Sequence, residues 1–123
     1  MVTITLPMPP TANHIWQHAG GRHYLSAAYE QFKRHVANQI MVADLPTYLK
    51  ERIAVRIDLH FKSKHRCDIE NRVKALNDAI SQSSKLWADD ALIDLLIVQR
   101  KENDSNGKCV VSVCLMEECE ELF

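Results

Sequence analysis

The sequence lacks any apolar run long enough to cross a membrane. No stretch of its 123 residues approaches the roughly 18 consecutive apolar residues that a spanning helix needs. The opening segment, MVTITLPMPP, also lacks the basic residues followed by an apolar run that mark a secretory signal. With 46% hydrophobic and 25% charged residues, the composition is that of an ordinary globular protein. We therefore expect a cytoplasmic protein with no membrane attachment.

The sequence also lacks a cysteine pattern that would hold zinc. It contains four cysteines, and no two of them form a C-x-x-C pair. Cys109 and Cys114 are an odd number of residues apart in a predicted strand, so their side chains should point to opposite faces of a sheet. We interpret the cysteines as buried free thiols. They are Cys67, Cys109, Cys114 and Cys119.

A strong net charge is absent as well. The formal charge is −1, which gives the chain no overall attraction to nucleic acid. Four of the acidic residues nevertheless fall in the last seven positions, as Glu117, Glu118, Glu120 and Glu121. Without them the 15 basic residues outnumber the remaining 12 acidic ones, a charge of +3. The sequence therefore predicts a mildly basic domain over residues 1–116 and an acidic C-terminal tail over residues 117–123.

Neither an internal repeat nor a Gly/Ser-rich linker divides the chain, so we expect one domain. Residues 3–6, TITL, predict a short strand, and the proline- and glycine-containing stretch 9–25 predicts a long extended loop. Ser26 is a suitable N-cap for a helix that ends near Ala43. The helix spacing predicts one buried stripe. It consists of Tyr29, Phe32, Val36 and Ile40.

From residue 55 onward, apolar and polar side chains alternate as far as Lys62, the period of a half-buried strand, and the apolar members are Ile53, Val55, Ile57, Leu59 and Phe61. Arg56, Asp58 and His60 are expected on its solvent face. The same polar side continues into a row of cations formed by Lys62, Lys64 and Arg66. Such a row is either a solvated strand end that deters aggregation or a set of phosphate contacts, and the acidic residues that follow favour the second interpretation.

Asp68 is expected to cap a second helix, whose core stripe would be Ile69, Val73, Leu76 and Ile80. Residues 95–101 predict a strand, the NDSNG segment 103–107 a turn, and residues 109–116 the returning strand. The predicted order is β-α-β-α-β-β. We expect an α+β fold with a mixed sheet and two helices packed on it.

The stretch RCDIENRVKALND and the later WADD hold most of the candidate site residues. Each charge has an ordinary structural explanation. Asp68 is a possible helix cap, Glu70, Lys74 and Asp78 are possible ion pairs on a solvated helix face, and the pair after Trp87 is a possible turn.

A functional interpretation explains these residues together. At a junction between a strand and a helix, the backbone turn can direct the carboxylates of Asp68 and Glu70 toward one point. A third carboxylate from Asp89 or Asp90 would complete an oxygen site suited to Mg²⁺, which keeps several waters and binds substrate phosphates. Lys74, one helix turn from Glu70, would reach the same phosphate.

The sequence resembles the RusA family of Holliday junction resolvases. The pattern D-[IL]-[DE]-N-x-x-K-x-x-x-D occurs here from Asp68 to Asp78, followed by Trp87-Ala-Asp89-Asp90. The front half matches as well, with L-P-x-P-P-x-x-N from Leu6 to Asn13 and then Gly-Arg-x-x-x-Ser from Gly21 to Ser26. The resemblance covers about residues 2–116.

The resemblance implies a homodimeric, Mg²⁺-dependent endodeoxyribonuclease, with Mn²⁺ as a possible substitute, that nicks two opposed strands of a four-way DNA junction during recombination and repair. Asp68, Glu70 and Asp90 match the family's essential acidic positions, and Lys74 matches its catalytic lysine. Asp89 stands beside them and joins the expected metal ligands. The expected DNA-binding residues are Asn13, Arg22, Lys62, Lys64, Arg66 and Asn71. With such a substrate, the protein would act at the nucleoid in the cytoplasm.

Two alternatives from other functional classes stay open. A catalytically impaired junction-binding or DNA-binding protein of the same fold would keep the basic row but tolerate an imperfect acidic cluster. A protein-interaction domain would use its acidic tail to bind a basic partner, with the helix charges solvated. Metal binding at the carboxylates separates these alternatives, because a solvated helix would bind no metal.

Overall fold

The computed structural model describes residues 1–11, 16–19, 22–64, 68–83 and 86–122. For residues 16–19, 22–25 and 120–122 it describes the backbone only. The central feature is a mixed sheet in the order β1-β6-β4-β5. Strand β4 lies parallel to β5 and antiparallel to β6, and β1 pairs antiparallel with β6. The bounds are β1 Val2–Leu6, β4 Ile53–His60, β5 Ile93–Arg100 and β6 Lys108–Leu115.

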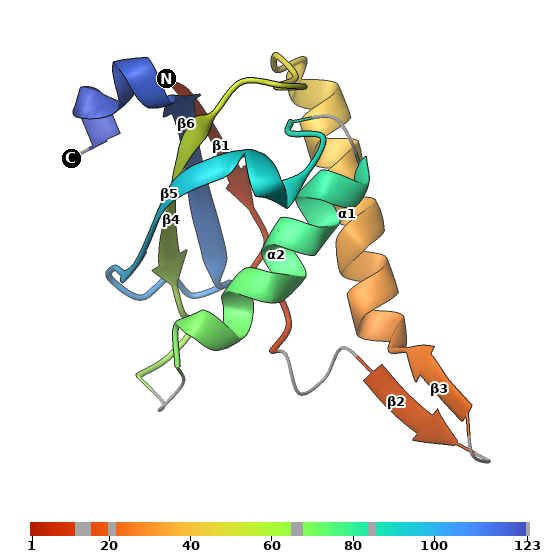
Figure 1. The fold of residues 1–123 in the computed structure, drawn as a ribbon. Helices are drawn as coiled ribbons and strands as arrows, with labels where there is room; N and C mark the ends of the chain where they lie inside the picture. Colours follow the sequence, from red (N-terminus) through yellow and green to blue (C-terminus); the bar gives the residue numbers. More distant parts are fainter. Residues whose placement is uncertain (12–15, 20–21, 65–67, 84–85, 123) are drawn as a thin grey trace.

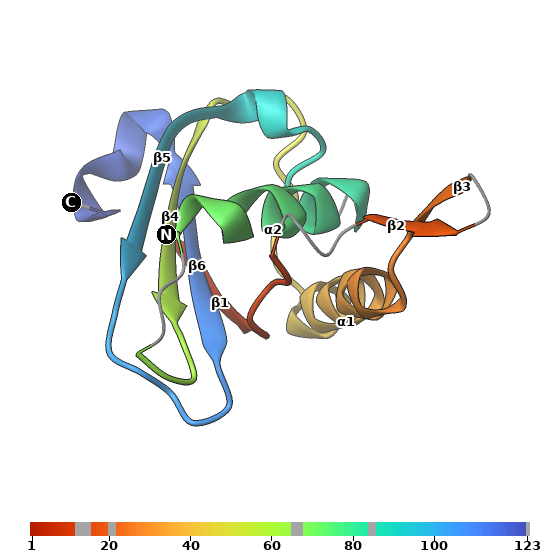
Figure 2. The same cartoon turned by 90° about the horizontal axis from the view of Figure 1, so that it is seen from below.

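Helices α1 (Ala27–Ala43) and α2 (Glu70–Ser83) pack against each other on one face of this sheet (Figures 1 and 2). The main core lies between the sheet and these helices. The helical period of the sequence explains α1, because its buried residues are the predicted stripe of Tyr29, Phe32, Val36 and Ile40. Ser26 caps the helix, and its hydroxyl accepts a hydrogen bond of 3.2 Å from the backbone N–H of Tyr29. The predicted α+β fold with helices on a mixed sheet is confirmed.

One prediction was wrong in the first quarter of the chain. Where we expected a long loop, β2 (Trp16–Ala19) and β3 (Arg22–Leu25) form an antiparallel hairpin. The hairpin extends away from the sheet and leads into α1 (Figure 1). Two glycines at positions 20 and 21 separate its strands in the sequence, and two such residues between short strands are a hairpin signal that we had assigned to a loop.

The pairing of the last two strands also differs from the expectation. The turn after β5 does return the chain, and Gly107 adopts a φ of +70°, which favours glycine. However, β6 pairs with β4 and β1, so β4 lies between β5 and β6. A turn signal reports only that the chain reverses direction, whereas the partner of a strand depends on contacts that are distant in sequence.

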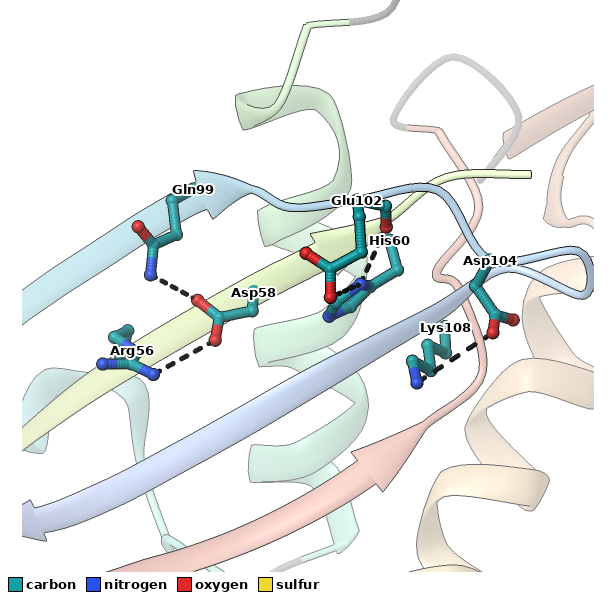
Figure 3. Close-up of polar contacts among 7 residues, drawn as sticks. All are labelled: Arg56, Asp58, His60, Gln99, Glu102, Asp104 and Lys108. Atoms are coloured by element: carbon teal, nitrogen blue, oxygen red, sulfur yellow. Dashed lines mark hydrogen bonds and ion pairs between the residues drawn. The ribbon is translucent and has the colours of Figure 1, made fainter. Parts of the chain in front are cut away.

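Strand β4 is buried on both faces, which corrects the prediction of a solvent-facing polar side. Asp58 and His60 are 7% and 9% exposed. Figure 3 shows their partners on the sheet face opposite α1 and α2: Asp58 accepts hydrogen bonds from Gln99 at 2.6 Å and from Arg56 at 3.2 Å. The His60 Nδ1 donates to the backbone carbonyl of Glu102 at 2.8 Å. The polar residues are therefore buried with partners, since an unpaired polar group in the interior would be costly.

The segment that carries the acidic tail packs on this second sheet face. Residues Met116–Leu122 form the 3₁₀-helical segment η3, which contacts β6 and β4. Met116 and Cys119 pack against Ala54 and Cys114. Cys109 and Cys114 are buried on opposite faces of the sheet, as predicted, while Cys119 is half-buried and Cys67 lies outside the described residues. Within the described chain, no helix has the length and apolar character to span a bilayer.

Candidate active site

The start of α2 carries the first group of predicted site residues. The chain leaves β4, and the backbone N–H groups of Asn71 and Arg72 then donate to the carbonyls of Asp68 and Ile69, both at 3.2 Å. These bonds form the turn that leads into α2, which begins at Glu70, two residues after Asp68. Glu70 therefore lies in the first turn, where the helix dipole favours a carboxylate. Lys74 follows one turn later on the same side.

Arg72 fixes this end of the helix to the rest of the fold. Its Nη1 donates to the backbone carbonyl of Pro9 at 2.7 Å, which ties the segment after β1 to α2. Its guanidinium also lies 5.4 Å from the ring centre of the buried Phe61. Arg100 at the end of β5 approaches the same ring at 4.6 Å. The two cation–π contacts hold the end of β4 between α2 and β5.

Asp68, Glu70 and Lys74 share one open pocket between α2 and β5. The pocket has a volume of about 660 Å³. All three charged side chains are exposed at its rim, while the other lining residues are apolar. Those apolar residues are Ile69, Val73, Leu96 and Val98. The structure therefore brings three of the predicted catalytic residues together at a cavity.

The second group of predicted residues is positioned by Trp87, which is completely buried. The backbone beside Trp87 pairs with the segment after α1, through hydrogen bonds from Tyr48 N–H to Leu86 at 2.8 Å and from Ala88 N–H to Tyr48 at 3.0 Å. The Trp87 Nε1 donates to the Oδ1 of Asp90 at 2.7 Å. The indole therefore sets the position of this carboxylate.

The two adjacent aspartates have different local roles. Asp89 caps the short 3₁₀ helix η2 (Asp90–Leu92), with its Oδ1 accepting from the backbone N–H of Ala91 at 2.9 Å. Asp90 is half-buried, and burial raises its pKa above the ordinary value, with further upward contributions from the charges of Asp78 and Asp89. Hydrogen bonds from Trp87 and Ser81 act in the opposite direction.

Asp78 connects the two groups, although we had not assigned it to the site from the sequence. Lys74 Nζ lies 3.3 Å from the Oδ2 of Asp78, whose charge also acts on Asp90. Burial and the charges of Asp78 and Asp90 raise the pKa of Tyr29 to about 12, so its phenol stays neutral beside them. The spacing of Glu70, Lys74 and Asp78 at steps of four had already indicated one stripe of α2.

The donor chemistry of these residues fits a hard divalent cation, because every candidate ligand is a carboxylate oxygen. The ligands are nevertheless not assembled as a set. Across the described residues, no three His, Cys, Asp or Glu side chains are arranged to hold a metal ion, and this includes Asp68, Glu70, Asp89 and Asp90. Asp68 and Glu70 line the pocket, whereas Asp90 does not. Lys74 and Asp78 connect the two groups, because Lys74 pairs with Asp78 and the charge of Asp78 acts on Asp90.

The predicted DNA-binding residues are placed only in part. Lys62 and Lys64 are exposed after the end of β4, and Asn71 is half-buried in the first turn of α2. Asn13 and Arg66 lie outside the described residues. Arg22 begins β3, but its side chain is outside the description. The apolar lining by Leu96 and Val98 was missed altogether, because a run of apolar residues in a strand normally indicates only core.

Comparison with known proteins gives a consistent result. The family model described as Endodeoxyribonuclease RusA matches residues 7–114. The chain is 35% identical over 98 residues to the Crossover junction endodeoxyribonuclease RusA of Escherichia coli strain K12, covering 79% of this chain and 81% of the relative. For the protein of the same name in E. coli O139:H28, strain E24377A, the identity is 35% over 111 residues, 90% and 92% of the two chains. For that of Enterobacteria phage 82, it is 34% over 97 residues, 78% and 80%.

Replacing Asp90 by asparagine should stabilise the fold at pH 7, by less than about 1 kcal/mol because the site is partly exposed to solvent. The folded pKa of Asp90 lies above its ordinary value of 3.8, so the fold favours the protonated form. That favourable contribution is present below pH 3.8 and is lost as the pH rises through the folded pKa. The asparagine side chain cannot ionise and retains an oxygen for Trp87. Urea unfolding at pH 3 and pH 7 should therefore show a gain only at pH 7.

Asp94→Asn provides a control of opposite sign. Asp94 pairs with Arg52, and the hydrogen bond and charge of this partner lower the pKa of Asp94. Its stabilising contribution is present above the ordinary pKa, so the substitution should reduce stability at pH 7 and not at pH 3. Equal effects of the two substitutions at pH 7 would contradict the electrostatic account of Asp90.

Proposed function

Because the chain belongs to the RusA endodeoxyribonuclease family, we propose that it is a structure-specific endonuclease that resolves four-way DNA junctions by paired nicks in recombination and repair. The observation that carries the proposal is the shared pocket of Asp68, Glu70 and Lys74, within a family match that spans residues 7–114. Its substrate would place the protein at the nucleoid in the cytoplasm.

In this proposal the scissile phosphate binds at the pocket rim, where Lys74 offsets the negative charge that develops on its oxygens. Lys74 lines the pocket, and its Nζ lies 3.3 Å from the Oδ2 of Asp78 on the same helix face, which supports this role. Glu70 has no ion-pair partner among the described residues, so its charge is available to a ligand.

We propose Mg²⁺ as the cofactor, with Mn²⁺ as a substitute, held by Asp68 and Glu70 together with Asp89 and Asp90. A bound ion of this kind polarises a phosphoryl oxygen and lowers the pKa of an attacking water. Two carboxylates, waters and a substrate phosphate are sufficient ligands for Mg²⁺. Asp68 and Glu70 at the pocket rim would therefore supply the first two protein ligands. Trp87 and Ser81 would orient Asp90 through the hydrogen bonds that they donate.

Two opposed cuts require two active sites, so we propose a homodimer whose twofold axis coincides with that of the junction. Lys62 and Lys64 would contact phosphates beside the pocket, as would Arg66 from the same segment. Asn71, in the first turn of α2, and Asn13 and Arg22, from the N-terminal matched stretches, complete the proposed DNA-binding residues.

A second candidate is a protein of the same fold that binds junctions without cutting them. The observation that favours it is the separation of the candidate ligands, since no three of them form a metal site within the described chain. The two candidates make the same prediction for DNA binding and differ in cleavage.

We expect the purified protein to cut a labelled four-way junction in Mg²⁺ and to leave a linear duplex of the same sequence intact. Denaturing gels would resolve the products, and a reaction without divalent metal is the control. Junction binding without cutting in Mg²⁺ or Mn²⁺ would establish the second candidate. Equal cutting of linear and branched DNA would show a nuclease without junction specificity.

A supercoiled plasmid with an extruded cruciform tests the proposed dimer. Paired cuts give linear DNA, whereas independent cuts give nicked circles first.

Asp68→Asn should abolish cleavage while junction binding is retained or tightened, because the substitution removes an oxygen ligand and a charge that repels phosphate. Lys74→Ala should slow cleavage by roughly 100-fold if the ammonium stabilises charge in the transition state. Lys50→Ala is a matched control, since Lys50 is also exposed but does not line the pocket. Wild-type rates for the first two variants would show that the charges on α2 are only solvated.

Changing the tail glutamates Glu117, Glu118, Glu120 and Glu121 to glutamine should tighten DNA binding without changing which substrate is cut. The replacement moves the net charge from −1 to +3 and retains Met116 and Cys119, which pack on the sheet. Phosphate neutralisation dominates sequence-independent affinity, so the gain should shrink at high salt, where screening is strong. Fluorescence anisotropy at two salt concentrations measures the effect, and a gain that is independent of salt would contradict it.

A further inference from the structure

The pocket between α2 and β5 contains more apolar surface than a phosphate and a metal ion would need. Its charged residues occupy the rim, and Leu96 and Val98 of β5 contribute its apolar floor together with Ile69 and Val73 of α2. Leu96 is 40% exposed, which places it among the exposed large hydrophobic residues of the protein. Apolar surface next to a charged site indicates a ligand that is itself part apolar.

The position of β5 in the sheet explains why this floor is open. Leu96 and Val98 pair with Val55 and Ile57 of β4, which are completely buried on the helix side of the sheet. Strand β5 is at the edge of the sheet, so it lies at the margin of the helical cover. An exposed leucine on an edge strand makes a protein prone to aggregation. Its position beside the carboxylates therefore indicates a role in ligand binding.

The same face of β5 ends in a cation. Side chains two residues apart lie on one face of a strand, so Leu96, Val98 and Arg100 form a row. Arg100 is exposed and its guanidinium lies over the ring of Phe61 at 4.6 Å, a contact that fixes the direction of the side chain. With a rise of about 3.3 Å per residue, its Cα is roughly 6.6 Å from that of Val98. The face of β5 is therefore apolar at the pocket and cationic beyond it.

We infer that this pocket binds the nucleotide next to the scissile phosphate in an unstacked state, with its base or sugar on Leu96 and Val98 and its outer phosphate toward Arg100. The inference rests on the proposed function, and it makes Leu96 and Val98 determinants of sequence preference. A nucleotide within a DNA strand has the required chemistry. Its base has a flat apolar face, and one phosphate lies on each side of its sugar. Lys74 would meet one phosphate and Arg100 the other.

The branch of a junction favours this occupant. Taking a base out of a duplex costs a few kcal/mol, and the cost is least where pairing and stacking are already disrupted. A volume of about 660 Å³ accommodates one nucleoside. A second copy of the chain is the competing occupant, but it would enclose Asp68, Glu70 and Lys74 at the rim, and burying such charges is costly.

Leu96→Ala tests the inference, with Leu49→Ala as the matched control. Leu49 is 62% exposed and does not line the pocket. Single-turnover cleavage would be measured on a set of junctions that differ only in the dinucleotides at the branch. Removing three carbons of apolar surface should slow the preferred junction by about 10-fold and reduce the discrimination between dinucleotides. Leu49→Ala should match the wild type in both measurements.

A second measurement does not depend on cleavage. A 2-aminopurine base at the branch becomes more fluorescent when it is unstacked, and binding without divalent metal keeps the junction intact. The wild type should brighten the probe, Leu49→Ala should do the same, and Leu96→Ala should brighten it much less at saturating protein. Full brightening by Leu96→Ala, together with unchanged dinucleotide preference, would overturn the inference.

The remaining outcomes separate this inference from the proposed function. If the wild type does not cut any junction, the proposed function fails, and the fluorescence measurement still decides whether the pocket takes a base. If the wild type cuts but Leu96→Ala equals it, only the inference fails. Light scattering completes the test, because a loss of dimer in Leu96→Ala alone would show that a second copy covers the pocket, which would also overturn the inference.

Discussion

The double-sided burial of β4 is the constraint on which the rest of the structure depends. β4 pairs with β5 on one edge and β6 on the other, and it supplies Ile53, Val55, Ile57 and Leu59 to the core beneath the helices. Its other face is buried through paired polar groups around Asp58 and His60. Because both neighbours of β4 come from later in the chain, the sheet forms only when distant segments meet, and α2 is then placed over it.

The residues at the start of α2 and Asp90 are positioned on this sheet by different means. α2 begins at Glu70, two residues after Asp68, and both residues line the pocket at β5. Asp90 comes from a separate segment that is fixed by the burial of Trp87 and by its backbone pairing with Tyr48. Glu70 and Lys74 are therefore held by a helix on the core, and Asp90 is held by a buried tryptophan.

Local signals in the sequence were sufficient for α1 and for the presence of α2, with Asp68, Glu70 and Lys74 close together at its start. A helical stripe and an N-cap depend on residues within a few positions of each other, and the structure follows them at Ser26 and Ile40. The partners of β6, the burial of Asp58 and the exposure of Leu96 depend on which strand is central and which is at the edge. That order is set by nonlocal packing, so no local pattern contains it.

The stripe of Glu70, Lys74 and Asp78 on α2 has the spacing of a solvated helix face, but Asp90 joins it from another segment. On such a face, carboxylates and cations alternate at steps of four and offset each other. Here Lys74 is paired with Asp78, Glu70 has no ion-pair partner among the described residues, and the half-buried Asp90 adds a further negative charge to the same region. Burial, together with the charges of Asp78 and Asp89, raises the pKa of Asp90 and disfavours its ionised form. A cation bound near these carboxylates would offset that cost, because it favours the ionised form of Asp90.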